Sequence, residues 1–324
     1  MYVRSVGEQP AVSVVIPTFE RPDLLRRAIA SVRHQTWCDW EAIVVDDCST
    51  ADIASVVDGI GDARVRVVRR AVNGGVAAAQ NTGLDEAQGR YVSFLHSDDE
   101  WAPERLASMV PLLDASPCDV GGVECGALVI EPSGTHRATE PWLLGATDAD
   151  LLAYRAGVHI SSLLLRRELA LATRFDEELR HTEDRDFTIR LLRRTRLVFE
   201  PRLLVLVHRE GPGLRDRNKA PTCEYLIGKY EAELRGDAGL QAIWWSRLAR
   251  LAARSGDRAT TRSAMRRAVR ARPGRVRWWP LLAAAHLPGA ACTRSFAAYV
   301  AVARMRVRLR QRTHAHAGGA PSGE

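Results

Sequence analysis

The first ninety-nine residues alternate short, β-branched apolar runs with amphipathic helical patterns, and this alternation constrains the fold more than any other feature of the sequence. The apolar runs are Val12–Ile16, Ala42–Val45, Val65–Val68 and Tyr91–Leu95, and the helical patterns are Arg21–His34 and Val76–Ala87. Strands this apolar, joined by helices, indicate a mainly parallel twisted sheet that is covered by helices on both faces. The sequence therefore predicts an α/β fold.

Polar and acidic residues follow three of these predicted strands at the point where each strand ends. They are Pro17-Thr18-Phe19-Glu20, Asp46-Asp47 and Asp98-Asp99. Open α/β sheets bind ligands beyond the carboxyl ends of their strands, so these residues should converge on one edge. Their carboxylates suit Mg²⁺ or Mn²⁺, whose remaining positions can take diphosphate oxygens. Either acidic pair alone could instead be a helix cap or a solvated turn, but two pairs on one edge favour a site.

Three segments, in order, resemble family 2 of the inverting glycosyltransferases, which have the GT-A fold. The segments are VSVVIPTFERPDLLRRAIASVRHQTWCDWEAIVVDDCST, NGGVAAAQNTGLDEAQGRYVSFLHSDDEW and FDEELRHTEDRDFTIRLL, and the match runs from about residue 11 to about residue 210. The resemblance implies transfer of a sugar from a nucleotide-diphosphate donor, with a UDP-sugar expected, to a hydroxyl of a glycan, a lipid-linked saccharide or another glycoconjugate. The alternatives are a peptide or natural-product acceptor, a nucleotidyltransferase, and a catalytically inactive basic binding protein.

The resemblance also implies roles for individual residues. The implied donor-binding residues are Pro17, Thr18, Phe19, Glu20, Asp47, Asn73 and Asp98. Phe19 would lie against the nucleoside base, although it could simply pack in the core, and Asp47 would accept from the polar edge of the base. The implied ligands of a Mn²⁺ or Mg²⁺ ion are Asp99, Asp98 and His208, with a purely structural role as the alternative for His208. His96 replaces the first acid of the family's usual D-x-D-D, so the sequence departs from the family's pattern at this position.

An inverting displacement needs a group that takes the proton of the acceptor hydroxyl. The family's Glu-Asp pair is matched by Glu183-Asp184, with Asp184 as the expected base and Glu183 as the reserve. Thr182 precedes the pair and is predicted to cap the helix that follows. The alternative is that both acids only interact with the helix dipole, as acids in a first helical turn commonly do.

The composition changes near residue 212, which predicts two units. We expect an N-terminal extension over 1–10, a GT-A domain over 11–212, a small α-helical appendage over 213–312 and a disordered tail over 313–324. Residues 220–324 hold 19 Lys and Arg against six Asp and Glu, whereas the preceding residues hold 27 against 33. Such asymmetry favours a second unit that faces phosphates or an anionic membrane, with ordinary solvated helix faces as the alternative.

Helical patterns fill the basic part of the chain. Ile243–Ser255 and Arg258–Ala271, joined at Gly256-Asp257, are predicted to form a helical hairpin. Arg304, Arg308 and Arg312 lie along one stripe of a final helix, and that stripe is a candidate for peripheral contact with anionic lipid. No nucleic-acid partner is expected. The N-terminus lacks the pattern of a secretory signal and no apolar run is long enough to span a membrane, so we expect a cytoplasmic protein, with a membrane-peripheral location as the alternative.

Overall fold

The computed structural model describes residues 9–209, 219–287 and 290–299. Its contacts group the chain into two compact units, residues 1–211 and 212–324, and each is described by itself. Two of the expectations lie outside the described residues: the disordered tail over 313–324 and the arginine stripe that begins at Arg304. Most of the predicted N-terminal extension lies outside them as well.

The first unit is built on one sheet with strand order β3-β2-β1-β4-β8-β6-β9-β5, and β7 pairs with β6 beside this path. The strands are β1 Val12–Thr18, β2 Trp40–Asp46, β3 Val65–Arg69, β4 Tyr91–Phe94, β5 Glu100–Trp101, β6 Val120–Ile130, β7 His136–Thr139, β8 Leu163–Arg166 and β9 Arg196–His208. The helices are α1 Pro22–Arg33, α2 Ile53–Asp58, α3 Val76–Glu86, α4 Arg105–Asp114, α5 Asp148–Leu152, α6 Arg167–Thr173 and α7 Glu183–Leu192, with a 3₁₀ turn η1 at Ile160–Ser162. The α/β prediction is confirmed.

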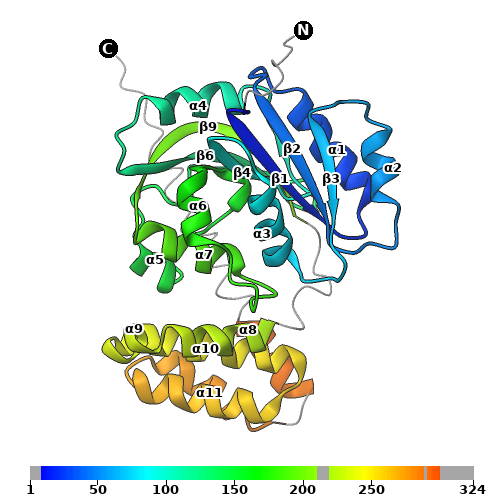
Figure 1. The fold of residues 1–324 in the computed structure, drawn as a ribbon. Coiled ribbons are helices and arrows are strands. Elements are labelled where there is room, and N and C mark those ends of the chain that lie inside the picture. The colour runs from blue at the N-terminus through cyan, green and yellow to red at the C-terminus, as the bar shows by residue number, and fades with distance from the viewer. Residues whose placement is uncertain (1–8, 210–218, 288–289, 300–324) are drawn as a thin grey trace, which may run out of the picture. The chain divides into compact units, whose positions relative to one another are not determined.

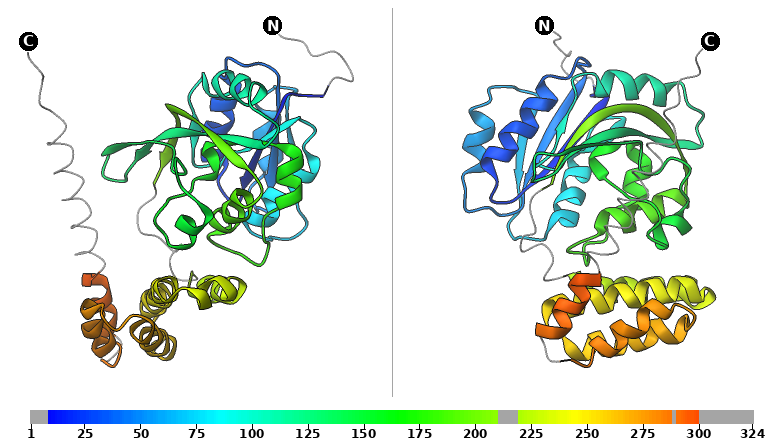
Figure 2. Two further views of the ribbon diagram at one scale, coloured as in Figure 1. Left: turned by 90° about the vertical axis from the view of Figure 1, so that its left-hand side faces the viewer. Right: turned by 180° about the vertical axis from the view of Figure 1, so that it is seen from behind.

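The sheet has a parallel half and a mixed half. β1 pairs in parallel with both β2 and β4, and β2 pairs in parallel with β3, as the apolar runs predict. From β4 onward the sheet is mixed, because β8 is antiparallel to both β4 and β6 while β9 is parallel to β6. β6 and β9 are long and curved (Figure 2), and their register shifts at three places, which is the usual way in which a sheet bends.

Helices cover both faces of the sheet (Figure 1), because alternate strand residues point to opposite sides. Val12, Val14 and Ile16 of β1 belong to one buried cluster with the apolar faces of α1 and α4. Val15 points the other way, toward α3, where a Cβ on Gly83 would lie 2.3 Å from a Val15 methyl carbon. Glycine at position 83 therefore allows α3 to approach the sheet closely. The T-shaped and stacked rings of Phe94, Phe175 and Phe187 join β4 to α7 on the same side.

The second unit consists of helices, as predicted. They include α8 Lys219–Lys229, α9 Glu231–Gly236, α10 Ala238–Ser255, α11 Arg258–Ala271 and α12 Trp279–Ala284, with a 3₁₀ turn η3 at Val276–Trp278, and residues 290–299 are also helical. Gly256 ends α10 in the left-handed conformation, and Asp257 caps α11 by accepting from the amide of Thr260 at 3.0 Å. The Gly-Asp pair thus forms the sharp turn of the predicted hairpin. Among the described helices, none combines the length and the apolar character needed to cross a membrane.

Candidate active site

The polar ends of β1, β2 and β4 lie side by side, because β1 is the strand between the other two. Thr18 is in register with Asp46 of β2, and the amide of Leu95 after β4 donates to the carbonyl of Val15 at 2.9 Å. A guanidinium nitrogen of Arg21 lies 3.0 Å from a carboxylate oxygen of Asp98, which ties the segment after β1 to the segment after β4. The three polar strand ends therefore form one continuous edge.

Asp47 is held in place by the turn that begins α3. Its Oδ1 accepts from the Gly74 amide at 3.0 Å and from Arg70 at 2.5 Å, and its Oδ2 accepts from the Gly75 amide at 2.7 Å. Gly75 has φ +84°, a conformation that glycine adopts without strain. A carboxylate offers about four acceptor positions, so about one remains on Asp47 for an incoming donor.

The residues after β1 differ in what their side chains do. Phe19 is 45% exposed, so its ring does not pack in the core as the alternative held. Thr18 is buried, and its hydroxyl oxygen has no hydrogen-bond partner among the residues that the structure describes. The Glu20 carboxylate accepts from the amide and hydroxyl of Thr50 at 2.6 and 2.8 Å, which commits it to the turn after β2. Asn73 is exposed, on the segment that leads to Gly74.

Three potential metal ligands gather beyond β4. One ligand atom from each of His96, Asp99 and His159 can be chosen so that all lie within 4.8 Å of one another. His159 Nε2 lies 3.5 Å, and His96 Nδ1 4.0 Å, from Oδ2 of Asp99, which also accepts from the Ser161 hydroxyl at 2.7 Å. Burial raises the pKa of Asp99 to about 6, and burial lowers the pKa of His159 to about 4, so the His159 ring is neutral at pH 7. Neutral imidazole is the form that binds metals.

The other predicted ligands lie differently. Asp98 pairs with Arg21, and its backbone carbonyl accepts from Arg27 at 2.9 Å. The His208 ring lies 2.7 Å from a carboxylate oxygen of Glu100, whose partner in the β5–β9 ladder is Leu206, two residues before His208. Of the three predicted ligands, only Asp99 belongs to the His-Asp-His cluster.

The predicted base lies at the start of α7, but the predicted cap does not form. Thr182 makes no side-chain capping bond and has φ +66°, so the prediction that it caps the helix was wrong. A β-branched residue in this region is a genuine outlier, and such strain persists where the surroundings over-determine the backbone. Glu183 is buried and Asp184 is half-buried, so the latter carboxylate is the more accessible of the pair.

Two other non-glycine residues with positive φ lie just after the ends of β1 and β2. Glu20 follows β1 with φ +54°, and Cys48 follows Asp47 with φ +67°. Backbone strain of this kind clusters at functional sites. Glu20 and Cys48 thus mark the ends of β1 and β2, whereas Tyr154 and Arg174, the other two such residues besides Thr182 among those described, follow α5 and α6.

His159 connects the two sides of the site electrostatically. Burial is the largest influence on its pKa, and the charges of Asp184 and Asp98 act in the opposite direction, toward protonation. The carboxylates on α7 and after β4 thus both act on this ring. Trp142 stacks on its face, with ring centroids 5.4 Å apart and planes 24° apart.

A buried carboxylate on β6, that of Glu124, holds together the segments that carry Trp142 and His159. Glu124 is fully buried and accepts from the amides of Trp142 and Leu143 at 3.1 and 2.8 Å and from the hydroxyl of Ser162 at 3.3 Å. Burial raises the pKa of Glu124 to about 7. Its hydrogen bonds join the segment that carries Trp142 to the segment that carries His159.

Sequence reasoning missed part of this site. His159 is not among the predicted ligands, and His96 was noted only as a departure from an acid. The available signal was the substitution itself, since a histidine in place of an acid is still a metal ligand. The partners Arg70, Ser161 and Glu124 had no signal, because their contacts join segments far apart in the sequence.

Residues 13–194 match the model of the family described as "Glycosyl transferase family 2". Since this match covers more than half of the chain, the chain belongs to that family. It is 40% identical over 113 residues to a putative teichuronic acid biosynthesis glycosyltransferase, TuaG, of Bacillus subtilis, covering 34% of this chain and 44% of TuaG. It is 39% identical over 100 residues to a putative colanic acid biosynthesis glycosyl transferase, WcaA, of Escherichia coli, covering 30% of this chain and 36% of WcaA. These matches span less than half the length of either relative.

A solved structure with the same fold is residues 1–349 of TarS from S. aureus. The TM-score is 0.60 at 20% sequence identity, and the alignment covers 88% of each chain. A mannosyltransferase, PcManGT, of Pyrobaculum calidifontis, solved with GDP-Man and Mn²⁺, gives a TM-score of 0.52 at 20% identity over 90% of this chain and 81% of the other. The predicted GT-A fold with helices after it is confirmed.

Proposed function

We propose that the chain is an inverting glycosyltransferase that moves a sugar from a nucleotide-diphosphate donor to an acceptor hydroxyl. The observation that carries the proposal is the position of His159, which lies beside Asp99 at 3.5 Å and is also influenced by the charge of Asp184. A cluster that can bind a cation beyond the parallel strands and an accessible carboxylate whose charge acts on one imidazole of that cluster are the two parts that this reaction needs.

A UDP-sugar is the donor that we propose. The edge beyond β1 and β2 offers the exposed ring of Phe19 and the last acceptor position of Asp47 to a nucleoside, and the buried hydroxyl of Thr18 there has no hydrogen-bond partner among the described residues. The TarS fragment has also been solved with UDP-GlcNAc. A relative that is 32% identical over 102 residues is named a UDP-Glc:alpha-D-GlcNAc-diphosphoundecaprenol beta-1,3-glucosyltransferase. Pro17, Glu20, Asn73 and Asp98 stay predicted donor-binding residues.

A divalent ion is proposed at His96, Asp99 and His159. The cluster fits such an ion because it combines a carboxylate with two imidazoles, and because His159 Nε2 and His96 Nδ1 lie 3.5 and 4.0 Å from Oδ2 of Asp99. When bound, the ion would neutralise charge on the diphosphate. Imidazole ligands favour transition metals over Mg²⁺, so of the two expected ions we propose Mn²⁺. Asp98 and His208, which pair with Arg21 and Glu100, are not part of this ligand set.

Asp184 is the proposed general base. It would take the proton of the acceptor hydroxyl as that oxygen attacks the anomeric carbon opposite the departing diphosphate. Arg185 fixes the start of α7 by donating to the carbonyls of Leu151 and Ala156 at 2.7 and 3.1 Å. Thr182, strained in the left-handed region, sets the direction in which the Glu183-Asp184 pair leaves the preceding loop. Glu183 is the reserve because it is more buried.

The acceptor that we propose is a glycan or a lipid-linked saccharide, in line with the names of the relatives. The cytoplasmic location stays a prediction. So does contact of the C-terminal arginine stripe with a membrane.

The decisive test is a panel of nucleotide sugars, assayed for release of the nucleoside diphosphate with Mn²⁺, with Mg²⁺ and with a chelator. We expect release from at least one donor with Mn²⁺, less with Mg²⁺ and none with the chelator. A parallel assay for pyrophosphate release from nucleoside triphosphates tests the nucleotidyltransferase alternative. If no donor binds and no donor is turned over in the presence of Mn²⁺, the proposal is overturned.

A further inference from the structure

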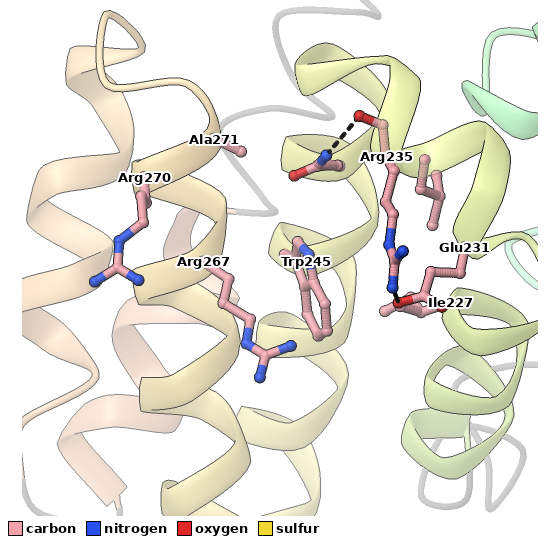
Figure 3. Close-up of a pocket in the computed structure, with 9 residues that line it drawn as sticks. Ile227, Glu231, Arg235, Trp245, Arg267, Arg270 and Ala271 are labelled. Carbon is pink, nitrogen blue, oxygen red and sulfur yellow. Dashed lines mark hydrogen bonds and ion pairs between the residues drawn. The ribbon is translucent and has the colours of Figure 1, made fainter.

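The helical unit contains a pocket of about 430 Å³ that the proposed reaction does not use. Its lining comes from four helices of that unit: Ile227 of α8, Glu231, Leu234 and Arg235 of α9, Gln241 and Trp245 of α10, and Arg267, Arg270 and Ala271 of α11. Figure 3 shows the Trp245 ring between the side chain of Arg267 and the ion pair of Arg235 with Glu231. Pockets of this volume hold small molecules or single units of a polymer.

The charges of the pocket do not cancel. The charge of Arg235 is balanced by Glu231, which lies one turn earlier on the same helix at 2.7 Å. Arg267 and Arg270 are both exposed, and neither has an acidic partner within salt-bridge distance among the described residues. The pocket therefore carries an excess of two positive charges, in the part of the chain where arginine is most abundant. Guanidinium groups bind carboxylates and phosphates in a bidentate manner.

The second recognition element is aromatic. Trp245 is half-buried, and the Arg267 guanidinium carbon lies 4.5 Å from its ring centroid, which is cation–π distance. That contact holds both side chains in place, so less conformational entropy is lost when a ligand binds. A flat indole face suits the C–H face of a sugar ring, and Ile227, Leu234 and Ala271 extend the apolar part of the lining.

We propose that this pocket binds an anionic saccharide, with a sugar ring against Trp245 and a carboxylate or phosphate of that saccharide on Arg267 and Arg270. An inorganic anion alone would leave most of the volume and the indole face unused. Single-stranded nucleic acid is bound by several aromatic side chains along a charged groove, whereas Trp245 is the one aromatic residue that lines this pocket. The inference rests on the proposed function in one respect, because that function makes this saccharide part of the acceptor.

Calorimetric titration of the full chain tests the proposal without any transfer reaction. The probes are an oligogalacturonate, a phosphorylated dextran oligomer and a neutral malto-oligosaccharide of similar length. We expect one or both anionic oligomers to bind and the neutral one to bind at least about tenfold more weakly. Equal binding of the neutral oligomer, or binding of neither anionic oligomer, would overturn the proposal.

Variants locate the binding. Trp245→Ala should weaken binding roughly tenfold, and Arg270→Gln about three- to tenfold. Arg266→Gln is the matched control, since Arg266 is exposed on the same helix, carries the same charge and does not line the pocket; its affinity should stay within about twofold. An equal loss in Arg266→Gln would mean that general surface charge binds the glycan and would contradict the proposal. Trp245→Phe, which keeps an aromatic face, covers the case in which the alanine variant does not fold.

Two additional probes test whether the pocket binds an anionic ligand other than a saccharide. A single-stranded RNA oligomer or vesicles of anionic lipid that bind as tightly as the glycan, with the same loss in Trp245→Ala, would overturn the assignment to a saccharide. Release of nucleoside diphosphate by the wild type, measured without glycan, decides the proposed function separately. Glycan binding without such release would support the proposed pocket and contradict the proposed transfer activity. Release without glycan binding would support the transfer activity and contradict the proposed pocket.

Discussion

The two halves of the sheet place functional groups by different means. In the parallel half, β3-β2-β1-β4, the groups follow from strand order: each strand ends at one edge, and the residues after it lie there. In the mixed half, β8-β6-β9-β5, they depend on long-range hydrogen bonds such as those that Glu124 accepts. The comparison teaches that the donor side follows from local patterns, whereas the proposed base and one metal ligand are positioned by the packing of distant segments.

The strongest test of this division is Asp184→Asn. If the mixed half contributes the chemistry and the parallel half binds the donor, the variant should lose about 10²- to 10⁴-fold in transfer rate, because a general base contributes that much. Donor affinity, measured by calorimetry with a nucleotide sugar and Mn²⁺, should change little. The control is Glu183→Gln, which should retain more activity than Asp184→Asn. Wild-type transfer by Asp184→Asn would remove this residue from the mechanism.

The proposed metal site draws on both halves of the sheet, because His159 of the mixed half joins Asp99, which follows β4 of the parallel half. We expect His159→Ala to weaken Mn²⁺ binding about 100-fold or more, since loss of an outer-shell partner alone typically costs 10- to 100-fold. Electron paramagnetic resonance of free Mn²⁺ gives the affinity without any turnover.

His208→Ala is the matched control for that measurement. The His208 ring pairs with Glu100, so this variant should bind Mn²⁺ nearly as well as the wild type. The opposite result, in which His208→Ala loses the ion and His159→Ala keeps it, would restore the ligand set expected from the sequence.

The smallest effect concerns stability and the buried carboxylate of Glu124. Burial raises its pKa from an ordinary 4.5 to about 7, so the folded state binds more protons than the unfolded state between these values. The stability that protonated Glu124 provides is therefore complete below about pH 4.5 and is lost as the pH rises through 7. Urea unfolding at pH 5 and pH 8 should show a steeper loss for the wild type than for Glu124→Gln. Parallel loss in both proteins would contradict this account.

Much of the first half was predictable from residues 11–99. The runs of Val and Ile, the helix starts and the acids after each run are local, and a parallel α/β arrangement leaves these strand ends on one edge. Even so, α2 was not predicted, because Ile53–Asp58 is a short helix with too few residues to show a period. In the second half, the sequence predicted the helix that begins after Thr182 but not the strands.

The sequence by itself determined the family, the α/β class, the helical second unit and the acids at the strand ends, because each depends on neighbours within one element. Only the tertiary structure decided that His96 and His159 join Asp99, that His208 pairs with Glu100, and that Thr182 is strained rather than capping. It also placed Trp245 and Arg267 in one pocket. The physical reason is that periodicity fixes which face a side chain occupies, but not which distant side chain occupies the space opposite.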